Sequence, residues 1–222
     1  MNAKERVMAV LNHQKPDRMP CFGANSTVTY EQMEQVIRAR RSIREFQDRE
    51  VPREVIEKLI DVARYAPTGH NNQGVKWHVI TGRETLKKLA GIGLDWMRWT
   101  IEKNPAMTEM MAGVIKRQES GFDEFLRGAP AVVMACVEKE NVMSGGDCTL
   151  ALAYLDLLAG AAGLGCCWGG FFNNAAASFP PMMEAVRVPD GLSPRGALMV
   201  GYPRYAYPRI PYRKPAAISW RP

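Results

Sequence analysis

Apolar positions recur along this chain at two different periods, which separate its helical stretches from its extended ones. Helical periodicity predicts helices, in chain order, over 31–40, 52–65, 84–90, 95–103, 147–162 and 181–186. A glycine-containing break is expected between the third and fourth of these. The 147–162 pattern is the strongest, and one side of that helix should carry the apolar residues Leu150, Tyr154, Leu157, Leu158 and Ala161.

Runs of β-branched and other apolar residues predict strands over 76–81, 131–137 and 197–200. Because helices come first and the strands are scattered among later helices, the order favours an α+β fold over a regular βαβ array. Residues 104–128 are rich in methionine and predict a mobile helical excursion. The proline-rich tail from Tyr202 is expected to be extended and to wrap over another surface.

Residues 1–30 predict an N-terminal extension and linker, which leaves 31–222 as one domain. Residues 1–20 resemble the start of uroporphyrinogen-decarboxylase-like proteins, but nothing of that barrel follows, so no activity is inferred from them. This end lacks the apolar core of a signal peptide. The apolar run 148–172 is interrupted by Asp156 and several glycines, which favours a buried helix over a membrane span.

The composition is that of a soluble globular protein, with 46% hydrophobic and 23% charged residues. The net charge of +6 fits an anionic ligand such as a phosphorylated cofactor or a dinucleotide. Nucleic acid is disfavoured as a partner, because no Lys/Arg stripe is interleaved with aromatic residues. The five cysteines lack C-x-x-C spacing and the three histidines are scattered. We therefore expect no metal site, and reduced thiols in the cytoplasm.

The segment Arg40-Arg41-Ser42-Ile43-Arg44 carries the clearest candidate chemistry, because it places three arginines and a hydroxyl between two predicted helices. A guanidinium fork binds a phosphate or carboxylate through two hydrogen bonds, and a serine hydroxyl can add another. Taken alone, the segment is more simply interpreted as a solvated basic turn. Three later stretches change that interpretation, namely 66–73, 165–171 and 201–215.

In this order and at these separations, the four stretches resemble the FMN-dependent nitroreductase family, over roughly residues 30–222. The tail is most like members that carry a ferredoxin-type domain ahead of the nitroreductase domain. The resemblance implies a mixed, mostly antiparallel sheet flanked by helices, in an intertwined homodimer with two flavins at the subunit interface. The extended tail would be exchanged between protomers. The chain departs from the family after Gln73, where proline usually follows and Gly74 stands instead.

The resemblance also implies which residues contact the flavin: Arg40, Arg41, Ser42, Arg44, Asn71, Gln73, Gly169, Gly170, Arg213 and Lys214. The first four would serve the phosphate, the ribityl chain and the pyrimidine edge, and the two amides would also suit that edge. The glycine pair would let a backbone N–H reach flavin N5, and the tail cations would close on the phosphate. The structural alternatives are a solvated turn, a packing glycine pair and a solvated basic tail.

The resemblance therefore implies an FMN-dependent oxidoreductase, in which NADH or NADPH reduces the flavin and an electron-poor small molecule is reduced next. Nitroaromatics and quinones are such acceptors. No catalytic side chain is named, because flavin N5 carries the chemistry. The chain lacks the cysteines of the ferredoxin-type domain, so a free reductant or a separate ferredoxin-like protein supplies electrons. The alternatives are a flavin-binding or sensory protein without turnover, and a colourless anion-binding module.

Overall fold

A computed structural model describes residues 30–141 and 145–221 of the chain. The expectations about residues 1–29, including the resemblance of 1–20 to uroporphyrinogen-decarboxylase-like proteins, lie outside the described residues. The chain divides into two units, 1–37 and 38–222, and the fold below is that of the second. Helix α2 (Tyr30–Ala39) is amphipathic, as its sequence predicts, and ends just before the arginine segment.

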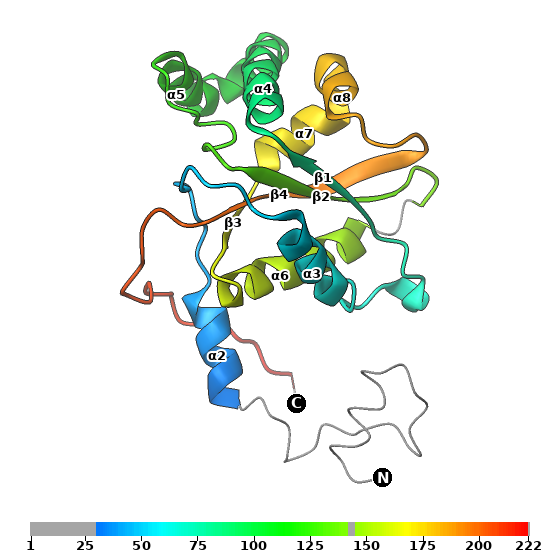
Figure 1. The fold of residues 1–222 in the computed structure, drawn as a ribbon, viewed down its shortest axis with the longest axis vertical. Helices are drawn as coiled ribbons and strands as arrows, with labels where there is room; N and C mark the ends of the chain where they lie inside the picture. The colour runs from blue at the N-terminus through cyan, green and yellow to red at the C-terminus, as the bar shows by residue number, and fades with distance from the viewer. Residues whose placement is uncertain (1–29, 142–144, 222) are drawn as a thin grey trace. The chain divides into compact units, whose positions relative to one another are not determined.

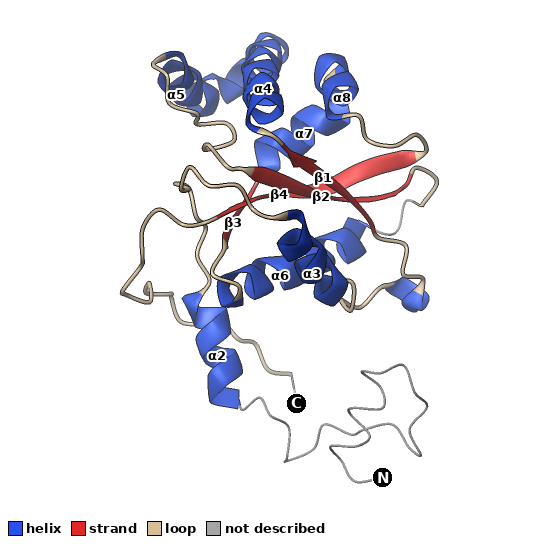
Figure 2. Cartoon of the chain, viewed as in Figure 1, coloured by secondary structure: helices blue, strands red, loops and turns tan. Residues whose placement is uncertain are grey.

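An antiparallel sheet forms the centre of residues 38–222 (Figure 2). The described residues give it the strand order β1-β2-β4-β3, with each neighbouring pair antiparallel. Its strands are β1 (Lys76–Thr81), β2 (Ala131–Glu138), β3 (Gly165–Trp168) and β4 (Leu192–Gly201). An isolated parallel bridge joins Ser42 to Cys166 beside β3. The predicted α+β class with a mixed, mostly antiparallel sheet is confirmed.

Helices cover both faces of this sheet (Figure 1). One face packs against α4 (Arg83–Lys103), α5 (Thr108–Glu119), α7 (Gly170–Ser178) and α8 (Pro180–Val186). The other face packs against α3 (Arg53–Ala63) and α6 (Gly145–Ala161). Short 3₁₀ turns lie at Gly69–Asn71 (η1) and Pro105–Met107 (η2). None of the helices in the described residues is both long and apolar enough to cross a membrane.

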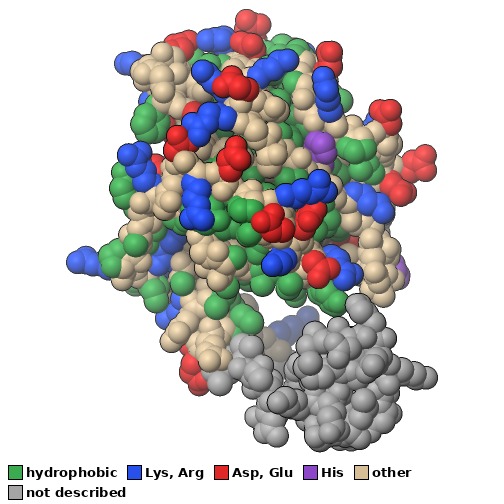
Figure 3. All heavy atoms as spheres, viewed as in Figure 1, with side chains coloured by type: hydrophobic (Ala, Val, Ile, Leu, Met, Phe, Trp, Pro, Cys, Tyr) green, Lys and Arg blue, Asp and Glu red, His purple; other side chains and the backbone are tan. Residues whose placement is uncertain are grey.

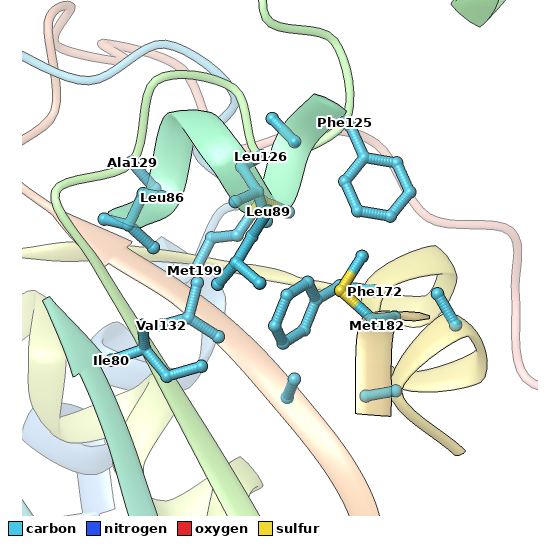
Figure 4. Packing of buried hydrophobic residues seen from close by; sticks show 14 of the residues in the cluster. Ile80, Leu86, Leu89, Phe125, Leu126, Ala129, Val132, Phe172, Met182 and Met199 are labelled. Carbon is cyan, nitrogen blue, oxygen red and sulfur yellow. The ribbon is translucent and has the colours of Figure 1, made fainter. Parts of the chain in front are cut away.

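Alternating side chains of β2 enter two separate cores, as expected for a central strand covered on both faces. Val132 packs with Leu89, Phe172 and Met199 in one core, which Figure 4 shows from close by. Val133 packs in the other core, against α3 and α6. All of β2 except its last residue is buried, so the sheet has a rigid centre from which its two edges project.

The predicted break between 84–90 and 95–103 is wrong, because α4 runs unbroken from Arg83 to Lys103. Gly93 lies inside this helix, where it makes room for Phe125: a Cβ at Gly93 would collide with the phenyl ring. The glycine is therefore a packing requirement, although such a residue in a sequence usually indicates a helix break. Residues 104–128 contain helix α5, which ends at Glu119.

The helix predicted over 147–162 is present as α6, and the apolar side predicted for it lies largely on the outside of the helix. Leu150 and Tyr154 of α6 are 43% and 41% exposed, whereas Ala151, Leu152 and Leu155 are buried. Nearly all of this helix is apolar, so periodicity alone could not tell its core side from its outer side. An exposed apolar stripe on α6 is typical of a surface that another protein covers.

The motif 165–171 was not predicted to form helix or strand, and it folds into β3 and the start of α7. The tail after Gly201 has no helix or strand as far as Arg221, in agreement with the expectation of an extended segment. It leaves several large apolar side chains exposed, namely Tyr205, Tyr207, Ile210, Tyr212, Ile218 and Trp220.

Candidate functional site

The arginine segment lies along the outer edge of β3. The Ile43 backbone N–H donates to the Cys166 carbonyl at 2.8 Å, and Ser42 forms the parallel bridge with Cys166. Gly165 allows this close approach, because a Cβ there would collide with the Ile43 side chain. The structure therefore brings the first and third motifs side by side, although more than a hundred residues separate them in the sequence.

Arg40 and Arg41 are held by different partners. The Arg40 Nη1 atom lies 3.3 Å from Asp156 Oδ2 on α6, and the side chains are 32% and 5% exposed. Burial raises the pKa of Asp156, and the Arg40 charge and hydrogen bonds from Trp168 and Arg40 oppose that rise. The Arg41 guanidinium donates to the carbonyls of Arg38, Arg40 and Arg209, the last at 2.8 Å.

Arg127, which the sequence analysis missed, lowers the pKa of the same thiol as Arg44 does, namely that of Cys167. Burial raises the pKa of Cys167, and the charges of Arg44 and Arg127 oppose that rise. Arg127 follows α5 and adopts a left-handed backbone, with φ of 61°. Its Nη2 lies 3.0 Å from Glu124 Oε1, and this 8% exposed carboxylate also pairs with Arg117 at 2.9 Å. No sequence motif marks Arg127, because its place depends on how the loop before β2 folds.

The two glycines of the third motif have different roles. The Gly169 N–H donates to the Ala197 carbonyl at 2.9 Å, so it is already engaged within the sheet. Gly170 begins α7, where the N–H has no partner within the helix. A Cβ at Gly170 would meet nothing within 4 Å, so there is open space beside this residue. Of the predicted pair, Gly170 is therefore the one whose N–H is not engaged in the sheet.

The second motif lies at the other end of the sheet. Asn71 closes the η1 turn with φ of 53°, and Gln73 follows with φ of 50°; both side chains are exposed. Lys76 at the start of β1 pairs with Cys136 of β2. Cys166 of β3 pairs with Val200 of β4, Val200 pairs with Ala131 of β2, and Ala131 pairs with Thr81 at the end of β1.

From Cys166 to Lys76 is thus three strand spacings across the sheet and five residues along it. At about 4.8 Å per strand and about 3.3 Å per residue, this separation is roughly 22 Å. Figure 1 agrees, since the cyan turn after α3 lies far from β3. One chain therefore does not bring Asn71 and Gln73 to the arginine segment.

The tail is brought to the arginine segment by the Arg41–Arg209 hydrogen bond. Arg213 and Lys214, the two predicted tail residues, follow shortly after and are exposed, and Arg213 donates to the neighbouring Tyr212 carbonyl. Within a single chain, these cations have no recorded contact with the predicted site. Arg209, which was not among the predicted residues, contacts the segment through its backbone carbonyl.

Positive charge is concentrated in these segments. Nine of the 29 Lys and Arg residues lie in 38–44 and 202–222, which contain no Asp or Glu; the rest of the chain carries 20 basic and 23 acidic residues. The face shown in Figure 3 accordingly mixes blue and red side chains over much of its area. The net charge of +6 therefore arises from the two segments that would bind an anion.

The remaining candidate groups give no sign of chemistry of their own. Burial raises the pKa of Cys136 to about 11 and that of Cys148 to about 12, and it raises the pKa of Cys166 still more strongly. Such thiols are unreactive near neutral pH. No group of three or more His, Cys, Asp or Glu in residues 30–141 and 145–221 is arranged to hold a metal ion.

The model of the nitroreductase family matches residues 37–202. This chain belongs to the nitroreductase family. The resemblance inferred from the four motifs is thereby confirmed, and the matched range contains three of them in full.

Two archaeal relatives are similar over most of their length. A protein of Methanothermobacter thermautotrophicus, provisionally named as an NADH dehydrogenase/NAD(P)H nitroreductase, is 27% identical over 179 residues, which are 76% of each chain. An equally named protein of Archaeoglobus fulgidus is 27% identical over 76% of this chain and 84% of its own. The solved Bacteroides fragilis nitroreductase with bound FMN shares the fold, with a TM-score of 0.70, 19% identity, and coverage of 85% and 97%.

The donor set of this chain fits FMN. The arginine segment supplies cations and a hydroxyl for a phosphate and a polar chain. Gly170 has no neighbour at its Cβ position, and its N–H is the one of the glycine pair that is not engaged in the sheet, as a ring placed against this backbone would require.

Proposed function

We propose that this protein is an FMN-dependent oxidoreductase that uses NADH or NADPH to reduce small electron-poor molecules such as nitroaromatics or quinones. The observation that carries the proposal is the attachment of the arginine segment to β3, the strand that leads into Gly170. A cation cluster and an available backbone N–H thus share one edge of the sheet. The names of the archaeal relatives support the reaction class and the donor.

Each residue of the site has a defined task in this proposal. Arg40, Arg41 and Ser42 bind the phosphate and the ribityl chain, and Arg44 faces the pyrimidine edge, where a cation favours the reduced flavin. Gly170 donates its N–H toward N5, and Gly169 holds the start of α7 to β4. A bound FMN would supply the hydride-transfer chemistry, so no side chain of this chain would need to act as acid, base or nucleophile.

The active species in this proposal is a homodimer. Because Asn71 and Gln73 precede Lys76, which lies roughly 22 Å from Cys166 beside the arginine segment, they reach the flavin held by the other protomer. The tail, with its exposed aromatic residues, then wraps over the second subunit and brings Arg213 and Lys214 to a phosphate. The exposed stripe of Leu150 and Tyr154 on α6 fits the same assembly.

The same proposal covers the setting of the protein. Residues 31–222 act as the flavin-binding domain and 1–30 as an extension. Reduced, unreactive thiols fit the cytoplasm. The donor is NADH or NADPH in the first instance, and a separate ferredoxin-like protein is the alternative donor.

The test is a visible absorption spectrum after incubation with FMN and desalting, repeated anaerobically with each pyridine nucleotide. A retained flavin band that bleaches with NADH or NADPH is the expected result, and it identifies the donor. A retained band that bleaches only with reduced ferredoxin makes that protein the donor. A colourless protein contradicts the proposal.

A further inference from the structure

Helix α6 contains one acidic residue in its interior, and that residue is buried. Asp156 stands among Leu155, Leu157 and Leu158, on a helix that is otherwise apolar after its first turn. Its side chain is 5% exposed. A buried carboxylate is costly unless it is paired and hydrogen-bonded, so a helix with so many apolar alternatives has a reason to keep it.

The partners of Asp156 come from two of the predicted cofactor motifs. Arg40, at 3.3 Å, belongs to the arginine segment. Trp168, whose side chain favours the charged carboxylate and so opposes the rise in its pKa, directly precedes the Gly169-Gly170 pair. The charge of the same carboxylate helps to raise the pKa of the buried Cys166. The backbone of Cys166 accepts a hydrogen bond from the Ile43 N–H and forms the bridge with Ser42. Asp156 therefore lies close to both the arginine segment, which would bind the phosphate, and the strand that leads to the glycine pair, which would lie beside the ring.

We infer that Asp156 is a positioning residue of the cofactor site, which orients the Arg40 guanidinium toward the flavin phosphate from behind. This inference rests on the proposed function. The recorded contact uses Nη1 of Arg40, which leaves the other N–H groups of the fork to face an anion. A guanidinium fork binds phosphate well only when its plane is fixed, and one carboxylate behind it supplies that constraint.

A purely structural role and a competing role make different predictions. If Asp156 only holds α6 against the arginine segment, its loss weakens the binding of FMN and of riboflavin equally. If it competes with the phosphate for Arg40, its loss strengthens FMN binding. If it orients Arg40, its loss weakens the binding of FMN but not of riboflavin, which lacks the phosphate.

The experiment compares FMN and riboflavin dissociation constants, measured by flavin fluorescence, for the wild type, Asp156→Asn and Asp61→Asn. Asp61→Asn is the matched control, because it removes one carboxylate from an exposed ion pair with Arg64. Loss of one charge-assisted hydrogen bond costs about tenfold in affinity, so we expect Asp156→Asn to weaken FMN by about that factor. Riboflavin binding and the control variant should match the wild type.

Two further variants make the result decisive. In an Arg40→Gln background, adding Asp156→Asn should change FMN affinity no further, because the carboxylate acts through Arg40. Asp156→Glu keeps the charge and should weaken FMN less than Asp156→Asn; it also serves if the asparagine variant does not fold. Equal losses for both flavins, tighter FMN binding or an unchanged constant would each overturn the inference. A wild type that does not retain FMN would overturn the proposed function as well.

Discussion

The edge of the sheet at β3 and the turn before β1 are built in opposite ways. At β3 the arginine segment is joined to the strand by a backbone hydrogen bond and packs through the buried Ile43. At η1, three of the four residues His70–Gln73 have a positive φ, and their side chains are exposed. Left-handed non-glycine residues cost free energy and persist where the surroundings use them.

This difference indicates that the two halves of the site become ordered by different means. The β3 half is fixed by contacts within one chain. The η1 half is tied down more lightly, for instance by the Gly69 N–H to Asp147 Oδ1 at 3.1 Å. In the proposed dimer the second half gains its remaining contacts from the other protomer and the flavin. The predictions below perturb one half at a time.

The largest effect is expected for Gly165→Val, which breaks the β3 half. The new side chain would collide with Ile43 and with Pro203, so the arginine segment must detach or the strand must shift. Overpacking of this kind destabilises by about 1–3 kcal/mol. We expect a lower urea midpoint and loss of FMN binding. Gly160→Ala is the control, because a Cβ at Gly160 meets nothing within 4 Å.

Removal of the tail by truncation at Tyr202 is expected to act on the assembly. It removes the exposed aromatic residues and the cations Arg213 and Lys214, so the dimer should loosen and flavin should be released. Sedimentation velocity and the retained flavin absorbance measure the two effects. A truncated protein that stays dimeric and yellow would show that the tail has been assigned wrongly.

Mixed dimers sharpen the comparison between the two halves. Arg44→Ala removes a residue of the β3 half and Asn71→Ala one of the η1 half. If each site combines the two halves from different protomers, a mixed dimer has one site with both changes and one site with neither. We expect the mixture to regain up to half of the wild-type FMN binding in its heterodimers. Sites contained within one chain would give no such recovery, which makes titration of the tagged heterodimer decisive.

Much of the fold and part of the site could be predicted from the sequence. Strand 76–81 and the α+β class were correct because they depend on local patterns of apolar residues. Which side of α6 faces the core could not be predicted, because a helix that is apolar nearly all round carries no period that separates its core side from its outer side. Arg127 and the role of Asp156 escaped prediction because each depends on contacts between segments distant in the sequence.

The smallest effect is expected for Arg127→Met, which leaves both halves of the site intact. The charges of Arg127 and Arg44 both lower the pKa of Cys167, so the two charges lie near the same end of β3. If both face the pyrimidine edge, each favours the reduced flavin, and loss of either should lower its reduction potential. We expect a shift of up to about 30 mV for Arg127→Met, equivalent to about 1.4 kcal/mol for a two-electron couple.

Anaerobic titration against a reference dye measures this potential. Arg117→Met is the matched control, because Arg117 pairs with the same Glu124 carboxylate from α5 without acting on Cys167. Arg44→Ala should lower the potential further than Arg127→Met and should also weaken FMN binding. Equal shifts for Arg117→Met and Arg127→Met would mean that the ion pairs of Glu124 are responsible, and that Arg127 does not act on the flavin directly.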